Sequence, residues 1–378
     1  MNFALSEEQN MLQEMAKQFV NRESSLRRVR QLREDELGFS REVYGKMAEL
    51  GWLGMIFPEA RGGQEMGMVE MSVVMEELGR GLMPEPVLSS VLLGGAAILF
   101  RGNDEQQGEW LPRIAAGEAV VTLGYLEKQS RYDPFDVATT ATRDGGGWIL
   151  AGEKTLVPDA AGADAIVVTA RTEGGRRDRE GVDLFLIDLN SDGVELKPVP
   201  TMDFRRRAHV SLDKVRVDDS QRLSGATAPD VALEQALAAG TVGLCAEMLG
   251  SMNAAFEMTL EYLKTRKQFG VPIGSFQALK HRCADEYVQT ELARSSVYYA
   301  AMCLDEEMDD APVAVSTAKA RCNGAFHLIA NESIQMHGGI GMTDEHDIGF
   351  FFKRARVAEV TLGDTSFHRD RYARLKEY

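Results

Sequence analysis

The stretch ALAAGTVGLCAEMLGSMNAAFEMTLEYLKTRK, residues 236–267, predicts one long helix whose first half is apolar almost all round. A helix without a polar face is buried, so we expect this helix at the centre of a bundle and near a subunit interface. Small residues in its first half allow neighbouring helices to approach closely. These are Ala238, Ala239, Gly240 and Gly243.

Signals at both ends of this stretch predict a helical last third of the chain. Thr227 and Asp230 have the spacing of a capping box, with Pro229 inside the first turn. The sequence FGVPIG, residues 269–274, ends the long helix. The apolar pattern then predicts further helices at 276–307, 312–336, 345–360 and 365–377.

The first two thirds of the chain divide into a helical region and a β region. The helical region begins with Ser6 as an N-cap, and Gly51 and Gly79 mark helix ends. Short β-branched segments such as AVVTLGYLE and VDLFLIDL follow, which is typical of a compact antiparallel β domain. We therefore predict an α+β fold. Its domains are an N-terminal helical domain at 1–115, a middle β domain at 116–222 and a C-terminal helical bundle at 223–378.

The charge balance limits the possible partners. The chain has 378 residues and a net charge of −16, from 42 basic and 58 acidic residues. Binding nucleic acid without sequence preference needs clustered positive charge, so this balance argues against a nucleic-acid partner. The short basic runs Arg176–Arg177 and Arg205–Arg207 lie in polar segments. A solvated surface is favoured there over a phosphate site, and both interpretations stay open.

The cysteines and the chain start indicate the compartment. The four cysteines are widely spaced and form no CxxC pair, which fits reduced, packed thiols better than disulfides or zinc ligands. The start MNFALSEEQNM lacks the basic and apolar regions of a secretory signal. The apolar stretch at 91–100 is far shorter than the roughly 20 residues of a membrane helix. We expect a soluble, cytoplasmic protein that binds neither membrane nor metal.

Three motifs contain the residues that indicate a ligand-binding site. TRKQFGVPIGSFQALKHRCADE (265–286) combines basic residues with a glycine turn, QMHGGIG (335–341) is a glycine loop between helices, and GDTSFHRDR (363–371) opens the last helix. An arginine, exposed backbone and a helix N-terminus together suit a dinucleotide pyrophosphate. The alternative for the first two motifs is a helix-breaking turn with surface charge.

On these motifs the whole chain resembles the acyl-CoA dehydrogenase flavoprotein family. The resemblance implies N-terminal helices, a middle β-barrel and a C-terminal four-helix bundle. It also implies FAD and removal of an α-proton and a β-hydride from an acyl-CoA, which yields the 2-enoyl thioester. The implied partners are the acyl-CoA substrate, an electron-transfer flavoprotein or similar acceptor, and a homo- or heterotetramer with a family paralogue.

The resemblance assigns two groups of residues to FAD. The residues implied to contact its pyrophosphate and adenosine are Arg266, Gln268, Phe269 and Gln277. The residues implied to reach the FAD of a neighbouring subunit are Gln335, His337, Gly338 and Gly339. Taken alone, His337 fits a structural histidine as well as a ligand.

Both family positions for the proton-abstracting glutamate differ here. Gly363 replaces one glutamate, Asp364 follows it, and the resemblance places Thr365 and Ser366 on the flavin side. A second group of members carries the base where this chain has Leu233, with Glu234 next. The candidate catalytic residues are Asp364 and Glu234. Their structural alternatives are a helix cap for Asp364 and an exposed helix carboxylate for Glu234.

The β region also departs from the family. YLEKQSRYD stands where a threonine-glutamate-proline-glycine loop is common, and Leu156-Val157-Pro158 replaces tryptophan-isoleucine-threonine. Proline has neither a hydroxyl nor an N–H, so the flavin loses one hydrogen bond. Val157 and Pro158 would then hold the flavin by backbone and packing.

The pattern LGDTSFHRDRYARL, which lacks the glutamate, is similar to that of pimeloyl-CoA dehydrogenase small subunits. It is also similar to that of the partner chains of heterotetrameric steroid-CoA dehydrogenases. Three hypotheses remain. The chain is an FAD-dependent acyl-CoA dehydrogenase or one of its subunits, a non-catalytic chain that completes a partner's flavin site, or a flavin oxidase that uses Asp364 as base.

Overall fold

The computed structural model describes residues 5–378, and these form two compact units. Unit 1 comprises residues up to Gln31, Gly67–Met83 and Thr241–Tyr378, and unit 2 comprises Leu32–Met66 and Pro84–Gly240. The predicted fold class is confirmed, because helices precede and follow a seven-stranded sheet.

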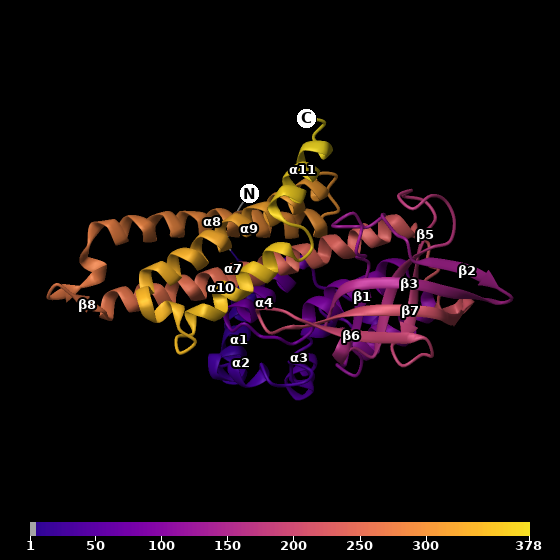
Figure 1. The fold of residues 1–378 in the computed structure, drawn as a ribbon, viewed down its shortest axis with the longest axis horizontal. Helices are drawn as coiled ribbons and strands as arrows, with labels where there is room; N and C mark the ends of the chain where they lie inside the picture. Colours follow the sequence, from indigo (N-terminus) through magenta and orange to yellow (C-terminus); the bar gives the residue numbers. More distant parts are fainter. Residues whose placement is uncertain (1–4) are drawn as a thin grey trace. The chain divides into compact units, whose positions relative to one another are not determined.

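Unit 1 is helical. Its helices are α1 (Glu7–Glu23), α4 (Met68–Arg80), the second part of α7 (Pro229–Thr265), α8 (Gln277–Asp305), α9 (Ala311–His337), α10 (Ile348–Val360) and α11 (Thr365–Leu375), and α2 (Leu26–Leu32) lies at its boundary. Helix α9 packs against α8, α10 and α11, and α8 and α9 lie side by side (Figure 1). The four helices predicted after the long one are therefore present, with ends within three residues of the expected positions.

Two glycines set the crossing of α4 and α7. A Cβ on Gly79 would overlap the backbone of Glu247, and a Cβ on Gly250 would overlap the carbonyl oxygen of Glu76. The expectation that Gly79 ends a helix was wrong, because α4 continues to Arg80 and Gly79 is the site of backbone contact. The local sequence does not distinguish a packing glycine from a terminating one.

Buried ion pairs join the helices of unit 1 near this crossing. Arg294 on α8 donates to Glu76 at 2.8 Å, and Tyr298 donates to the same carboxylate at 3.1 Å. Arg354 on α10 donates to Glu247 at 2.8 Å. Because buried charges need partners, these pairs accompany the close packing of the helices.

Two predicted helix caps have different outcomes. Ser6 caps α1, as predicted, and it does so through a reciprocal capping box with Gln9. The box expected at the start of α7 was wrong, because the helix begins at Pro229, so that Ala228 and not Thr227 directly precedes its first turn. Asp230 instead accepts a hydrogen bond from Arg179 at 2.6 Å.

Unit 2 contains the sheet and short helices. Its helices are α3 (Arg41–Glu49), a π-helix (Val87–Gly95), α5 (Ala96–Arg101) and α6 (Asp104–Ala115). Its strands are β1 (Val121–Gly124), β2 (Thr140–Asp144), β3 (Gly147–Pro158), β4 (Ala165–Arg171), β5 (Val182–Asp188), β6 (Val194–Pro200) and β7 (Arg206–Asp218). The strand order is β1-β4-β2-β3-β7-β6, with β5 paired to β4.

The sheet differs from the predicted antiparallel domain in two ways. Strand β1 pairs with β4 in parallel, and so does the end of β2, so the sheet is mixed. Strand β2 was not predicted, because four of its five residues are exposed and only Ala141 carries an apolar signal. The core of the sheet includes Trp148, Leu150, Phe185 and Val210.

Residues 5–378 were also expected to contain neither a membrane helix nor a metal site. No helix there is long and apolar enough to cross a membrane. The same residues contain no group of three or more histidines, cysteines, aspartates or glutamates placed to hold a metal ion. The four cysteines are free thiols.

Gly250→Ala should destabilise the protein by about 1–3 kcal/mol or more, because the added methyl overlaps backbone that has no room to move. Urea denaturation measures this change. Gly45→Ala is the matched control, since a Cβ at Gly45 in α3 meets nothing within 4 Å and alanine favours a helix by about 0.5–1 kcal/mol over glycine. Equal stability of wild type and Gly250→Ala would contradict the backbone crossing.

Candidate functional site

The glycine loop that follows α9 offers open backbone. The helix ends at His337, and Gly338 has a φ of 63°, a left-handed conformation that favours glycine. A Cβ on Gly338 or Gly339 would meet nothing within 4 Å, and both residues are exposed. A ligand can therefore approach this backbone closely.

His337 is buried directly beside this loop. Its ring stacks on Tyr262 and lies next to His346, with both centroid distances 4.5 Å. Nδ1 lies 2.7 Å from the carbonyl of Ser333 and donates to it, which leaves Nε2 as an acceptor. Nε2 is buried and has no partner among the described residues, and burial lowers the pKa of His337. The imidazole is therefore neutral, with one lone pair available to a ligand.

Gln335 lines a cavity of about 580 Å³ within unit 1. Helices α8, α9 and α10 and the loop after α9 contribute to its wall. Other lining residues are Arg282, Asn331, Glu332, Asp344 and Phe350. The mixed lining of charge, amide and aromatic rings suits a polar ligand that contains a flat ring.

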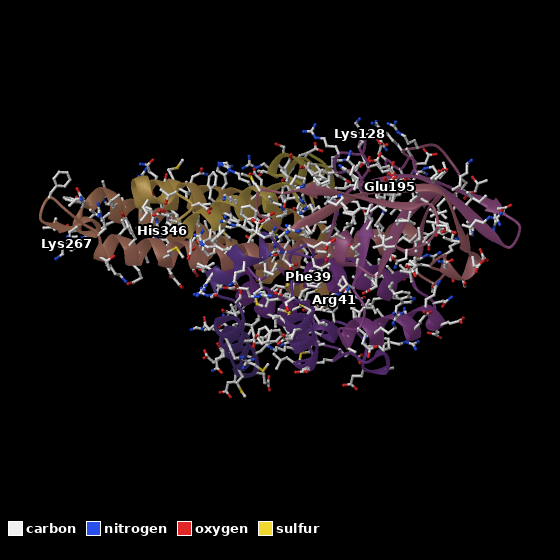
Figure 2. The ribbon with its side chains drawn as sticks, turned by 60° about the horizontal axis from the view of Figure 1, so that its bottom comes forward. Phe39, Arg41, Lys128, Glu195, Lys267 and His346 are labelled. Atoms are coloured by element: carbon white, nitrogen blue, oxygen red, sulfur yellow. The ribbon has the colours of Figure 1, made fainter. Side chains whose placement is uncertain are left out.

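The FGVPIG turn is a small hairpin of β8 (Lys267–Gln268) and β9 (Val271–Pro272). Phe269 and Gly270, with φ values of 54° and 81°, form the two-residue connection of a type I′ hairpin. Phe269 is 91% exposed at the tip, and Figure 2 shows neighbouring Lys267 at the free end of the α7–α8 pair. Arg266, Gln268 and Gln277 are exposed in the same segment.

The turn before α11 has no space for the missing glutamate. Gly363 has a φ of 107°, and a Cβ on it would lie 2.6 Å from His368 Nε2 and 2.6 Å from Phe367 Cδ1. Any side chain at this position would need both rings to move.

Asp364 caps α11. Its Oδ1 accepts a hydrogen bond from the Phe367 N–H at 2.8 Å, and its backbone carbonyl accepts one from His368 at 3.1 Å. Thr365 is the first residue of the helix and Ser366 is exposed. Asp364 therefore has the structural role of a cap, whatever further role it has.

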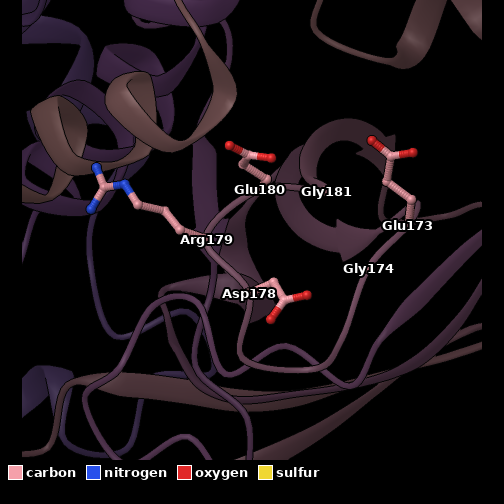
Figure 3. A pocket seen from close by; sticks show the side chains of 6 residues that line it. All are labelled: Glu173, Gly174, Asp178, Arg179, Glu180 and Gly181. Atoms are coloured by element: carbon pink, nitrogen blue, oxygen red, sulfur yellow. The ribbon is translucent and has the colours of Figure 1, made fainter.

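Glu234 is held in an ion pair within unit 2. Arg179, from the loop between β4 and β5, donates to both oxygens of Glu234 and to Asp230, and lies 4.7 Å above the Phe135 ring. Leu233 is fully buried. The Arg179 side chain extends away from Asp178 and Glu173, which line a cavity of about 550 Å³ in the same loop (Figure 3).

The Leu156–Pro158 segment contains a β-bulge. The pairing of β3 with β7 shifts between Lys154 and Val157, and Leu156 has a φ of 53° and is 41% exposed. Val157 points into the core of the sheet, so only its backbone is available to a ligand. The carbonyl of Pro158 accepts a hydrogen bond from Thr122 at 2.7 Å. Bulges of this kind re-aim side chains next to binding sites.

Sequence reasoning missed the ion pair that holds the YLEKQSRYD loop. Lys154 is fully buried and donates to Glu127 at 2.6 Å and to Thr169 at 3.0 Å. Glu127 also accepts from the backbone N–H groups of Ala138 and Thr139. Lys154 shares the strand face of buried Leu150, and this alternation could have identified an inward lysine.

Both groups of this pair are charged at neutral pH. Burial lowers the pKa of Lys154 to about 8. Burial acts to raise the pKa of Glu127, but the charge of Lys154 and hydrogen bonds to that carboxylate bring it to about 2. The pair therefore fixes the loop across the physiological pH range.

Comparison with known sequences decides the family. The chain matches three profiles in succession: the N-terminal domain of acyl-CoA dehydrogenase at residues 6–118, the middle domain at 122–215 and the C-terminal domain at 230–375. The chain belongs to the acyl-CoA dehydrogenase family. It is an oxidoreductase that acts on acyl-CoA, as the family resemblance predicted.

Relatives and solved structures agree over the full length. "Probable acyl-CoA dehydrogenase YngJ" of Bacillus subtilis is 30% identical over 375 residues, 98% of each chain. A variant of the Tcur3481-Tcur3483 steroid ACAD is 30% identical with a TM-score of 0.88, over 98% of each chain. A chain of the ChsE4-ChsE5 complex from Mycobacterium tuberculosis is 29% identical with a TM-score of 0.90, over 100% of this chain and 99% of that one.

The dehydrogenase also buries a carboxylate without a partner. Glu286 on α8 is 1% exposed, and neither of its oxygens has a hydrogen-bond partner among the described residues. Burial raises the pKa of Glu286 to about 8, with a further increase from the charge of Glu332, which pairs with Arg282 at 2.9 Å. Glu286 is therefore largely protonated at neutral pH.

Glu286→Gln should remove a pH dependence of the dehydrogenase's stability. The folded state holds this proton up to about pH 8, whereas the ordinary glutamate pKa is 4.5, so stability falls as pH rises from 4.5 to 8. At pH 9 the variant should be more stable than wild type by roughly 1–3 kcal/mol, and at pH 5 the two should be similar. Thermal melts across pH measure this, and Asp285→Asn, an exposed neighbour, is the control. Parallel pH profiles for wild type and variant would refute it.

Proposed function

We propose that this chain binds FAD and works as one subunit of a heteromeric acyl-CoA dehydrogenase, in which a partner chain supplies the base. The proposal rests on one observation: the carboxylates beside both base positions already have structural partners. Asp364 caps α11, Glu234 is bound by Arg179, and Gly363 has no space for a side chain. A general base must reach the proton that it removes, and both carboxylates already have other partners.

The FAD assignment is supported by polar groups and open backbone in unit 1 that are accessible to a ligand. Gln335 lines the cavity, Gly338 and Gly339 present open backbone, and His337 keeps an unpaired Nε2. The exposed guanidinium of Arg266 is suited to a phosphate. FAD, when bound, supplies the acceptor of the β-hydride. Arg266 would bind the pyrophosphate, and Gln335, His337 and the open glycine backbone would reach the FAD of a neighbouring subunit.

The sheet offers a different contact from the family's usual one. Pro158 has no N–H or hydroxyl to donate, and its carbonyl is bonded to Thr122. Exposed Leu156 at the bulge remains to pack against a ring. We infer that unit 2 orients the flavin through apolar contact and backbone, on a loop held rigid by Glu127 and Lys154.

Several exposed apolar side chains of unit 1 support an oligomer. Phe269, 91% exposed, lies in the first glycine motif, and Met342, 78% exposed, directly follows QMHGGIG. Tyr287 and Val288 are exposed on α8. Large apolar side chains that gather on a surface mark interaction sites. Two of the solved relatives carry paired names, ChsE4-ChsE5 and Tcur3481-Tcur3483, and one is described as a steroid ACAD. We infer a bulky acyl group for the substrate and a family paralogue as partner.

A second candidate is a self-sufficient enzyme with Asp364 as base. Its cap uses Oδ1, so Oδ2 is available for proton transfer, and the turn lies where the family carries its glutamate. A flavin oxidase would use the same group. Oxygen consumption during turnover distinguishes the oxidase from the dehydrogenase.

Gly338→Val should reduce the flavin content of the purified protein about tenfold. The branched side chain disfavours the left-handed backbone by roughly 1–2 kcal/mol and covers the open peptide groups. The ratio of flavin to protein absorbance measures the loss, and Gly45→Val, at another open glycine, is the control. Unchanged flavin content would remove the loop from the binding site.

The chain alone, loaded with FAD, should not lose its visible flavin band when acyl-CoAs with bulky acyl groups are added without oxygen. Bleaching should appear once a paralogue with the usual glutamate is co-expressed, and Asp364→Asn and Glu234→Gln should leave it unchanged. Anaerobic absorption spectra measure each case. Bleaching by the chain alone that disappears in Asp364→Asn would establish the self-sufficient enzyme instead.

A further inference from the structure

Lys319 is a buried cation in the middle of α9. Its side chain is fully buried, and the three N–H groups of Nζ are surrounded by four oxygens within hydrogen-bond distance, none of them from a carboxylate. The acceptors and distances are Asn323 Oδ1 at 2.7 Å, the carbonyls of Ala358 and Gly363 at 3.0 Å, and the carbonyl of Glu359 at 3.2 Å.

Two of these carbonyls belong to the end of α10. Ala358 and Glu359 lie in its last turn, where helix carbonyls lack partners within the helix and the dipole is negative. An ammonium from a neighbouring helix can donate hydrogen bonds to these carbonyls, and its positive charge is favourable at the negative end of the dipole. Lys319 therefore caps α10 from the side.

The turn that follows, Thr361–Asp364, has a backbone that side chains must hold. Leu362 and Gly363 have φ values of 58° and 107°, and a left-handed leucine is disfavoured. His368 Nε2 donates to the carbonyl of Leu362 at 2.8 Å, and Lys319 donates to that of Gly363. The conformation of the turn thus depends on buried groups from α9 and α11.

We propose that Lys319 is a positioning residue that holds the 361–364 turn and, through it, the first turn of α11. Asp364, Thr365 and Ser366 start that helix, so Nζ sets the direction of the groups assigned to the flavin side. The flavin part of this inference rests on the proposed function. The ordering of the turn does not.

The protonation of Lys319 gives the opening of the turn a pH dependence, which an uncharged side chain that only packed there would not give. Burial lowers the pKa of Lys319 to about 8 from its ordinary 10.5. A turn that opens exposes Nζ to water and restores the ordinary value, so the closed turn is favoured as pH rises through 8. Protection of the turn from opening should rise about tenfold between pH 7 and 9.

Other titratable and charged groups around Lys319 could also affect the pH dependence of the turn's protection. Those that face it are Cys245 from α7, Cys322 from α9, Arg354 and Glu359 from α10, and His368 from α11. Burial lowers the pKa of His368 to about 3, so it stays neutral in this range. The hydrogen bond that the Cys322 thiol donates to Cys245, together with burial, raises the pKa of Cys322.

Hydrogen–deuterium exchange of the full-length protein tests the proposal. The amides to follow are those of Thr361, Phe367 and His368, whose hydrogen bonds close the turn. In Lys319→Met their exchange should rise at least about tenfold, while exposed Lys17→Met should leave it unchanged. In wild type, after correction for intrinsic exchange rates, protection should rise with pH, and in Lys319→Met it should be flat.

Each outcome decides a part of the inference. Unchanged amide exchange in folded Lys319→Met would overturn the positioning role of Lys319. So would wild-type protection that does not change with pH. If the variant does not fold, the pH dependence of wild-type protection decides alone. FAD titration adds the functional part: Lys319→Met should bind FAD at least about tenfold more weakly, with a shifted visible band. A loosened turn with unchanged FAD binding would overturn the flavin-facing role. If wild type binds no FAD, the proposed function fails, and the exchange data still decide the role of Lys319.

Discussion

Two ammonium groups without access to water constrain the segments from which the site is built. An ammonium that leaves water must be surrounded by oxygen atoms. Lys154 obtains them from Glu127 and Thr169, and Lys319 obtains them from Asn323 and the carbonyls around Gly363. Glu127 belongs to the YLEKQSRYD loop and Gly363 to the turn before α11. Each buried ammonium therefore constrains one of these segments within its own unit.

The carboxylates that directly follow the family's two base positions have structural roles. His368 and Phe367 occupy the space beside Gly363, Asp364 ends the turn as a cap, and Glu234 is bound by Arg179. None of this changes the fold, which matches its relatives over the full length. The fold is thus separable from the residues that occupy the base positions, as expected when function lies in a site placed on a common scaffold.

The reliable predictions from sequence were those with a local cause. The capping box of Ser6 involves neighbours in the chain, and the helical periods repeat every three to four residues, so element types and ends were close to the structure. Strand β2 was missed because its exposed polar residues carry no alternation. The site residues were predicted from motifs, since an arginine and glycines near a helix end have a recognisable chemistry, and they stay predictions.

The sequence by itself determined the α+β class, the order of helices and strands, the family, and the absence of a glutamate at both usual positions. Only the tertiary structure decided that β1 pairs with β4 in parallel, that Gly79 is a packing contact, and that Glu234 is bound by Arg179. It also decided that Lys319, an unremarkable helix residue in the sequence, holds the turn at Gly363. The reason is distance along the chain. These contacts join residues 44 to 168 positions apart, and no local pattern of charge or hydrophobicity encodes which distant groups meet.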